Sequence, residues 1–369
     1  MGIFSFFLIA GCCLYTGCIV ILMIGLHNIR PGFSSRKPFV SVIIAARNER
    51  AQIGACLASL MNQSYSDDSY EVIVADDRSA DTTAEVLHRF MEVWSQLRVI
   101  KIRELVKHTS PKKHALSEAM RMAHGEIILQ TDADCIVPRE WISGMVRGFG
   151  EGIGMVTGIA PYHVEPGTLN SFVRHEYLWN AALSASSIAL GYGTHASSRN
   201  IAFRKDAFDR IGGYGFHKNV LSGDDTLLLH RMQKLKDSRV VTVTDSSTHV
   251  HTHAPQDFMS FVHQRIRHMS TGKYFNPFLI AVGGFVYGFH LLMLFSIPLS
   301  LCSIQILKLF AGIVLWKLFL DGLMAWRTTI VLGLNVQWKR FVINDVFLML
   351  YMATMPFLGL VVPIQWKEK

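Results

Sequence analysis

Apolar residues form long blocks at the two ends of the chain, and the polar residues are concentrated between them. Ile3 to Leu26 contains no charged side chain, and three further apolar stretches run from Pro277 to Ile304, Ile306 to Trp326 and Val346 to Ile364. About 20 consecutive apolar residues form a helix that crosses the bilayer core of about 30 Å. The pattern predicts a transmembrane anchor over 1–28 and about three membrane helices over 277–366.

The first apolar stretch has a second interpretation, a cleaved signal peptide. A signal peptide has a shorter apolar core and a small-residue cleavage site of the A-x-A type, and neither is found here. An uncleaved anchor is therefore favoured. Arg30, Arg36 and Lys37 follow the stretch, whereas almost nothing charged precedes it, so the positive-inside tendency predicts an inner-membrane protein whose next domain is cytoplasmic.

The stretch from Ile306 to Trp326 contains charged residues. Lys317 and Asp321 are four residues apart and share one helical face, where they can neutralise each other in lipid. A structural pair is favoured over a transport site. The number of full crossings stays open, because both the segment after Trp326 and the closing residues 366–369 are basic.

Between these blocks, residues 36–276 alternate short apolar runs with amphipathic stretches. "FVSVIIAARNE", "YEVIVADD", "LRVIKIRE" and "EIILQTDAD" have the character of buried strands, and helical patterns separate them. Thr82 and Glu85 have capping-box spacing at the start of one such helix. Repeated strand and helix units predict an α/β domain with a mostly parallel central sheet.

Charged residues follow these strands where each one ends. Arg47 and Glu49 follow the first, Asp77 the second, and Asp132 and Asp134 the fourth. Ligands of parallel sheets bind at the carboxyl ends of the strands. Two carboxylates at alternate positions suit Mg²⁺ or Mn²⁺ shared with a substrate diphosphate. An Asp-rich turn is the alternative interpretation, and the tripeptide taken alone favours it; the family resemblance given below favours the metal site.

Composition and charge narrow the class of protein. The 369 residues are 50% hydrophobic and 17% charged, which is too apolar for an ordinary soluble protein. A net charge of +8 would suit nucleic acid, but Lys and Arg form no dense run and no nucleic-acid-binding motif. Membrane-surface charge explains the excess better. Four of the six cysteines lie in apolar stretches, which argues against a disulfide scaffold.

Several ordered motifs resemble the GT-A glycosyltransferases of family 2, which include cellulose, chitin and hyaluronan synthases, ceramide glucosyltransferases and bacterial lipid glycosyltransferases. "VSVIIAARNE" resembles the opening strand, with Ala45 for a common proline. "VIVADDRSADTT" is similar to the family's V-D-D-G-S-T-D-x-T, with Arg78 for glycine. "KKHALSEAMRMAHGEIILQTDADC" resembles the stretch that ends in D-A-D. The similarity extends from about Pro38 to Tyr274.

This resemblance implies roles for the residues at the strand ends. Glu49 and Asp77 would contact the nucleoside of a nucleotide sugar, Arg47 would belong to the same binding set, and Lys112 would lie near the nucleotide. Asp132 would serve the phosphates, and Asp134, with Asp132 nearby, would hold the divalent cation.

"LSGDDTLLLHRM" resembles the family's G-E-D-x-x-L motif, with Asp224 in place of glutamate. A hydroxyl that attacks an anomeric carbon needs a general base, which is worth about 10²- to 10⁴-fold in rate. Asp225 is the candidate base. The two aspartates also suit the N-cap of the helix that follows, and both roles are compatible.

"QRIRHMSTGKY" resembles the Q-x-x-R-W element, through which Gln264 would orient the leaving group and Arg267 would neutralise it. His268 replaces the usual tryptophan and removes a stacking platform for a sugar ring. That change, with few membrane segments, disfavours a processive polysaccharide synthase.

"THVHTHAP" places His249, His251 and His253 at every second position, on one face if the segment is extended. Three imidazoles could bind zinc. A structural or pH-sensitive patch is favoured, because the matching family segment is an ordinary strand.

The expected function is a membrane-bound inverting glycosyltransferase that uses Mg²⁺ or Mn²⁺. It would move a sugar from a nucleotide sugar to a hydroxyl or phosphate of a lipid or lipid-linked acceptor, and it would bind no nucleic acid. Two alternatives stay open: a processive polysaccharide synthase of the same family, and an inactive membrane scaffold with a transferase fold.

Overall fold

The fold is that of a computed structural model. It describes residues 2–30, 32–106, 109–217, 220, 223–269, 272, 274–275 and 277–361. The chain divides into two compact units. The sheet unit comprises residues 29–163 and 187–253, and the helical unit comprises residues 1–28, 164–186 and 254–369.

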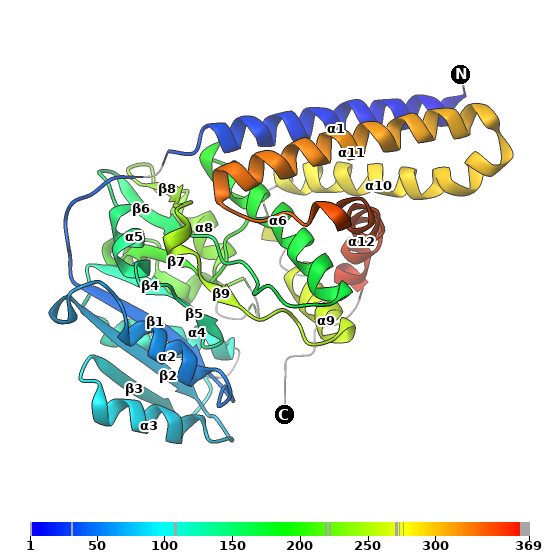
Figure 1. The fold of residues 1–369 in the computed structure, drawn as a ribbon. Coiled ribbons are helices and arrows are strands. Elements are labelled where there is room, and N and C mark those ends of the chain that lie inside the picture. Colours follow the sequence, from blue (N-terminus) through cyan, green and yellow to red (C-terminus); the bar gives the residue numbers. More distant parts are fainter. Residues whose placement is uncertain are drawn as a thin grey trace. The chain divides into compact units, whose positions relative to one another are not determined.

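The sheet unit is built on a seven-stranded sheet of order β3-β2-β1-β4-β7-β6-β8 (Figure 1). β1 (Val40–Ala46) pairs in parallel with β2 (Tyr70–Asp77) and β4 (Ile127–Gln130), and β2 pairs in parallel with β3 (Leu97–Ile102). β7 (Ile201–Arg204) is antiparallel to β4 and to β6 (Ile153–Thr157), and β6 pairs in parallel with β8 (Arg239–Thr242). The predicted mostly parallel sheet is confirmed.

Both faces of the sheet are covered, which explains why its central strands are almost continuously apolar. Val40, Val42 and Ile44 of β1 pack in one core with residues of α2 (Ile53–Met61), α3 (Thr83–Val93) and α5 (Trp141–Arg147). Ile43 points to the other face and packs in a second core with α4 (Pro111–Met122), α7 (Lys205–Arg210) and α8 (Thr226–Met232). Alternate side chains of one strand therefore serve two cores.

The expected elements from 39 to 134 match this structure within a few residues, with one error of detail. Thr82 occupies the N-cap position of α3, but its side chain makes no capping hydrogen bond, so the predicted capping box is wrong. Asp81 takes that role, because its carboxylate accepts from the backbone nitrogen and hydroxyl of Thr83 at 3.0 and 2.5 Å.

The loops after β1 and β2 are tied to each other. Asn48 has a positive φ of 56°, its backbone nitrogen donates to Ser79 Oγ at 3.1 Å, and its side-chain oxygen accepts from Ala80 N at 2.8 Å. Arg78 also has a φ of 56°, at the position where the family pattern has glycine. Non-glycine residues rarely adopt this conformation, so the bonds between the loops hold both backbones in place.

A small second sheet begins directly after the D-A-D segment in the chain: β5 (Cys135–Ile136) is antiparallel to β9 (His251–Thr252). Short 3₁₀ turns complete the unit at Asp67–Ser69, Gly213–His217 and Ser246–Thr248.

The helical unit contains α1 (Ile3–His27), α10 (Pro277–Cys302), α11 (Ile304–Leu332) and α12 (Phe341–Val361), with a 3₁₀ turn at Trp338–Arg340. α1, α10 and α11 run side by side in Figure 1. Most of α6 (Thr168–Ala189) and all of α9 (Phe258–Met269) belong to the same unit.

Three helical segments of the described chain are long and apolar enough to cross a membrane: Ile3–His27, Pro277–Cys302 and Trp338–Gly359. α11, which covers the stretch expected as a span from Ile306 to Trp326, is not among them. The last expected span runs to Ile364, and its end lies outside the described residues. The number of full crossings stays a prediction.

The expected Lys317 and Asp321 pair is present and belongs to a larger buried cluster. Lys317 Nζ donates to both Asp321 and Asp345, the latter at 2.8 Å, and Tyr15 OH donates to Asp321 Oδ1 at 2.6 Å. α1, α11 and α12 each contribute a polar side chain to this cluster.

Candidate active site

The candidate site lies where β1, β2 and β4 end. The register pairs Ala46 with Asp76 and Ile43 with Gln130, so the loops that carry Glu49, Asp77 and Asp132 leave the same edge of the sheet. Parallel strands bring their carboxyl ends to one edge, which is where the sequence predicts the ligand.

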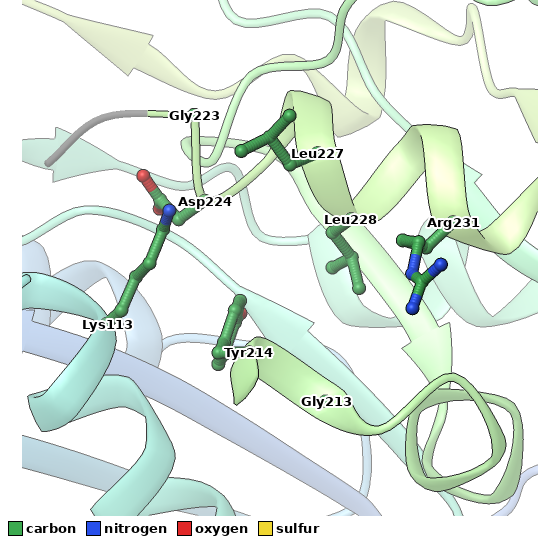
Figure 2. A pocket seen from close by; sticks show the side chains of 8 residues that line it. All are labelled: Lys113, Gly213, Tyr214, Gly223, Asp224, Leu227, Leu228 and Arg231. Carbon is green, nitrogen blue, oxygen red and sulfur yellow. The ribbon is translucent and has the colours of Figure 1, made fainter. Parts of the chain in front are cut away.

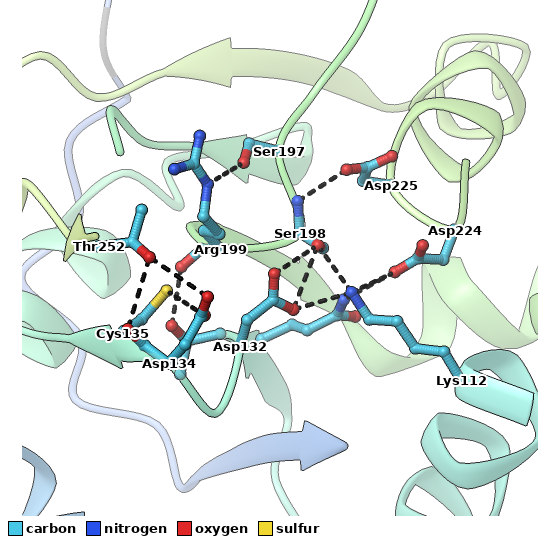
Figure 3. A network of polar contacts seen from close by, with 12 residues as sticks. Lys112, Asp132, Asp134, Cys135, Ser197, Ser198, Arg199, Asp224, Asp225 and Thr252 are labelled. Atoms are coloured by element: carbon cyan, nitrogen blue, oxygen red, sulfur yellow. Dashed lines mark hydrogen bonds and ion pairs between the residues drawn. The ribbon is translucent and has the colours of Figure 1, made fainter. Parts of the chain in front are cut away.

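Lys112 in the first turn of α4 is central to a polar network (Figure 3). Its Nζ donates to Asp132 Oδ1 at 2.8 Å and Ser198 Oγ at 2.9 Å, and lies 3.2 Å from Asp224 Oδ2. Burial alone would lower the pKa of Lys112, but the charges of Asp132 and Asp224 outweigh it and raise that pKa. The ammonium therefore stays charged.

Asp132 contacts both Lys112 and Ser198, which also contact each other (Figure 3). Both of its oxygens accept from Ser198 Oγ, at 3.2 and 3.1 Å. Burial disfavours its ionised form, but the charges of Lys112 and Arg199 and the hydrogen bonds lower the pKa of the carboxyl below its ordinary value. Asp132 is thus a fixed carboxylate.

Asp225 is joined to the same network through the backbone of Ser198, whose nitrogen donates to Asp225 Oδ2 at 2.8 Å (Figure 3). Asp225 is also the N-cap of α8, because its other oxygen accepts from Thr226 N at 2.6 Å. The cap predicted from the sequence is confirmed. Burial, and then the charge of Asp224, raise the pKa of Asp225 to about 6, a range that suits a general base.

Sequence reasoning missed three residues of this network, and Ser198 is the first. The other two lie behind Asp224: Tyr214 OH donates to Gln130 Oε1 at 2.6 Å, and Gln130 Nε2 donates to Asp224 Oδ2 at 3.5 Å. Two signals were available. Ser198 and Tyr214 lie in "SSRNIAFRKDAFDRIGGY", a stretch that resembles the family segment flanking the acceptor site. Gln130 is a lone amide that ends the apolar run of β4 and is fully buried.

A small pocket adjoins this end of the network (Figure 2). Its lining combines cationic, phenolic and aliphatic side chains from α4, the turn after α7, and α8: Lys113, Gly213, Tyr214, Gly223, Asp224, Leu227, Leu228 and Arg231. Lys113 Nζ donates to the carbonyl oxygen of Val220 at 2.9 Å, which ties Val220 to α4.

Asp134 is the residue best able to accept a cation. Among the described residues, its carboxylate oxygens have only two long contacts, from Thr252 Oγ1 at 3.3 Å and from the weak donor Cys135 Sγ at 3.5 Å. A carboxylate offers about four lone pairs, so most remain open to a ligand. No cluster of three or more His, Cys, Asp or Glu suited to a metal exists among the described residues. Proteins usually bind Mg²⁺ through one or two carboxylates, and substrate phosphates complete the coordination. The carboxylates of Asp134 and Asp132 fit this arrangement.

Glu49 shares a neighbourhood with the D-A-D pair around the thiol of Cys56. Burial, followed by the charges of Asp134, Asp132 and Glu49, raises the pKa of Cys56. Cys56 Sγ also donates to the backbone oxygen of Asp132 at 3.7 Å. Three predicted acidic residues therefore lie around one buried thiol.

Within the described residues, no hydrogen bond or ion pair joins Asp77 or Arg47 to the network of Lys112, Asp132 and Asp225. Asp77 accepts from Arg78 Nε at 2.8 Å, and within the described residues no hydrogen bond or ion pair joins it to Asp132. Arg47 is half-buried and makes no hydrogen bond or ion pair with any residue that the structure describes. Their contact with a nucleotide stays a prediction.

Gln264 and Arg267 lie on α9 in the helical unit. Gln264 Oε1 accepts from Arg265 Nη1 at 3.1 Å, and Arg265 Nη2 donates to Glu176 Oε2 of α6 at 2.5 Å. The buried Arg265 thus joins α9 to α6. The proposed action of Gln264 and Arg267 on a leaving group stays a prediction.

The histidine segment forms a patch of rings. His163 stacks on His251 with ring centroids 5.3 Å apart, and its centroid is 4.9 Å from that of His253. Burial, and then the charge of His163, lower the pKa of His251, so its neutral form is favoured. A structural patch remains the better interpretation.

Comparison with known families agrees with this geometry. The model of glycosyl transferase family 2 matches residues 41–212, and that of glycosyl transferase family group 2 matches residues 127–361, more than half of the chain. The chain belongs to glycosyltransferase family 2. It is therefore a glycosyltransferase, and the predicted GT-A fold and enzyme class are confirmed.

Two curated relatives of this glycosyltransferase show how far the similarity extends. Glycosyltransferase AglE of Haloferax volcanii is 26% identical over 193 residues, which are 52% of this chain and 60% of that protein. A beta-monoglucosyldiacylglycerol synthase of Trichormus variabilis is 35% identical over 112 residues, 30% of this chain and 24% of that protein. The match thus spans less than two thirds of either relative.

Among solved structures, mannosyltransferase PcManGT of Pyrobaculum calidifontis, in complex with GDP-Man and Mn²⁺, has the same fold. The TM-score is 0.61 at 19% identity, and the alignment covers 96% of this glycosyltransferase and 99% of that chain.

Proposed function

We propose that the chain transfers a sugar, with inversion, from a nucleotide sugar to a hydroxyl or phosphate of a lipid or lipid-linked acceptor at the cytoplasmic face of a membrane. One observation carries this proposal. Lys112, Asp132 and Asp225, from three separate segments, meet in a single hydrogen-bonded network through Ser198. A fixed ammonium, a fixed carboxylate and a carboxylate with a raised pKa are the groups that such a transfer needs.

In the proposed reaction the acceptor oxygen attacks the anomeric carbon, the bond from that carbon to the diphosphate oxygen breaks, and the nucleoside diphosphate leaves. Asp225 receives the acceptor proton. Lys112 holds Asp132 in place, and Glu49 and Asp77 bind the nucleoside. Arg267 neutralises the leaving group, which Gln264 orients.

A divalent cation would be held by Asp134, with Asp132 nearby, and when bound it would neutralise the diphosphate charge. The solved structure of the same fold in complex with GDP-Man and Mn²⁺ supports this choice. A lipid acceptor is supported by the name of the diacylglycerol glucoside synthase and by three helices able to cross a membrane.

The test is a panel of nucleotide sugars incubated with membranes that contain the full chain and Mn²⁺ or Mg²⁺. Wild type should release nucleoside diphosphate and form a glycolipid by single additions, and a chelator should stop both. Asp225→Asn should lower the rate at least 10²-fold. Asp237→Asn, an exposed aspartate of the same unit paired with Arg210, is the matched control and should retain activity.

Two results would overturn the proposal. One is nucleotide binding without release of nucleoside diphosphate whatever acceptor is offered, which would support an inactive scaffold. The other is full turnover on a soluble acceptor with no lipid present. A ladder of products would identify a processive synthase.

A further inference from the structure

The helical unit contains a pocket unrelated to the residues used for catalysis. It lies between α6 and the segment that joins α11 to α12, and its polar lining consists of Ser171, Arg174, His175, Asn335, Gln337 and Asn344. Every one of these residues belongs to the helical unit. None of them entered the sequence predictions.

The lining is rich in donors and includes an uncompensated cation. Arg174 is half-buried, and its guanidinium makes no hydrogen bond or ion pair with any described residue. Burial lowers the pKa of Arg174, which means that burial disfavours its charged form. A bound anion would offset this unfavourable desolvation. An arginine fork is shaped for two oxygens of a phosphate or carboxylate.

His175 lines the pocket and is oriented by a carboxylate. It is only 6% exposed, and its Nε2 forms an ion-pair contact of 3.6 Å with Asp345 Oδ1. The other oxygen of Asp345 is 2.8 Å from Lys317 Nζ. These contacts hold the ring of His175 in place.

Hydrogen bonds fix the other wall of the pocket. Ser171 Oγ donates to Gln337 Oε1 at 2.6 Å and accepts from Asn344 Nδ2 at 3.0 Å. Because its oxygen is occupied, Gln337 has its amide nitrogen left to offer a ligand. The pocket is thus built before a ligand arrives.

The neighbouring sequence places this pocket at headgroup level. α11 ends at Leu332, and the next candidate span begins at Trp338. Trp338, Lys339 and Arg340 are exposed there, and aromatic and basic side chains are typical of the membrane interface. Basic pockets between membrane helices on this kind of boundary suit lipid phosphates.

We propose that this pocket binds the phosphate group of an anionic membrane lipid, with Arg174 as the principal anchor and the amide nitrogen of Gln337 as a further donor. Binding would stabilise the junction of α6 with α12.

The test uses the purified full chain in a neutral detergent, with phosphatidylglycerol titrated into the micelles and the thermal unfolding midpoint measured. Phosphatidylcholine serves as the zwitterionic comparison, and inorganic phosphate as the soluble source of the same group. Wild type should show a saturable rise with phosphatidylglycerol. Arg174→Gln should weaken the apparent affinity roughly tenfold or more, since charged hydrogen bonds are lost. Arg174→Lys should restore part of it.

The matched control is Lys308→Gln, which removes one exposed positive charge from the other end of α11 and should leave the response unchanged. An unaltered midpoint of Arg174→Gln in pure detergent shows that the variant folds. An equal response of wild type and Arg174→Gln, or an equal loss in Lys308→Gln, overturns the proposal. Saturation by inorganic phosphate at the same concentrations overturns its lipid part. None of these measurements depends on sugar transfer.

Discussion

At the scale of single residues, the site consists of ionised groups whose charges are set by one another. Asp132 and Lys112 stabilise each other's charge, whereas Asp225 is buried beside a like charge. Two carboxylates with opposite pKa shifts in one network indicate a division of roles. Asp132 stays ionised as a fixed anion, and Asp225 can exchange a proton near neutral pH.

The first prediction concerns the pH dependence of Asp225. Its base form is the carboxylate, so the rate of transfer should fall to half as the pH is lowered through about 6. The raised pKa also means that the folded chain binds a proton more tightly than the unfolded chain, so the stability from this group is lost as pH rises from about 4 to about 6. A profile of rate from pH 5 to 8 checks the first point.

Asp225→Asn separates these two effects. The variant should lose activity at least 10²-fold, and between pH 4 and pH 7 its stability relative to wild type should rise by up to about 3 kcal/mol, because asparagine has no charge to bury. Asparagine has one acceptor oxygen and cannot accept from both Ser198 N and Thr226 N, but this cost is the same at the two pH values. Chemical denaturation at pH 4 and pH 7 measures the difference. A relative stability that does not change with pH would contradict the cost assigned to this carboxylate.

The second prediction concerns Tyr214, a positioning residue for Asp224. Tyr214→Phe leaves the buried Gln130 without its donor, which should cost about 1 to 3 kcal/mol. If Gln130 then releases Asp224, the like charge beside Asp225 weakens and the acid limb of the rate profile should move to lower pH. Tyr192→Phe, at an exposed tyrosine, should leave that limb in place. An unmoved limb in Tyr214→Phe would reduce its role to packing.

At the scale of elements, strands and helices with a clear pattern of apolar and polar residues could be predicted from the sequence, and those without such a pattern could not. β1 and β2 are long and bounded by polar turns, and both were expected within a few residues. β6 and β7 have only five and four residues, nearly all buried, and short apolar runs of this kind have no distinctive period. The network was predicted by motif and not by periodicity. Lys112 and Asp132 match motif positions of one stretch, whereas Ser198 and Tyr214 lie in another, at positions where the family pattern has glycine and phenylalanine.

The third prediction tests the packing of α1 against α6 within the helical unit. A Cβ at Gly25 would lie 2.6 Å from the backbone oxygen of Ser186, whereas one at Gly17 would meet nothing within 4 Å. Gly25→Ala should therefore destabilise the unit by about 1 to 3 kcal/mol through forced separation. Gly17→Ala in the same helix should be neutral or stabilising by up to about 1 kcal/mol. Thermal unfolding in detergent compares them, and equal midpoints would argue against this close approach.

At the scale of the whole molecule, the chain combines a catalytic sheet with helices that suit lipid. The Lys317 and Asp321 pair was predictable from its spacing of four residues. Tyr15 and Asp345 lie far from Lys317 in the sequence, and only the fold brings them together. The cluster joins three helices through charges that are nearly inaccessible to solvent. It therefore acts as a specific contact among helices whose other surfaces are apolar.

The fourth prediction follows from the charge of that cluster. Lys317→Met would leave two buried carboxylates without a cation, which typically costs about 3 to 5 kcal/mol. The variant should unfold at a lower temperature in detergent and give less monodisperse protein, while Lys308→Met, at an exposed position on α11, should behave as wild type. Adding Asp321→Asn and Asp345→Asn to Lys317→Met should recover much of the loss, because neutral groups need no counter-charge. Recovery would assign the cost to unpaired charge, whereas failure to recover would assign it to the shape of lysine or to hydrogen bonds that methionine cannot make.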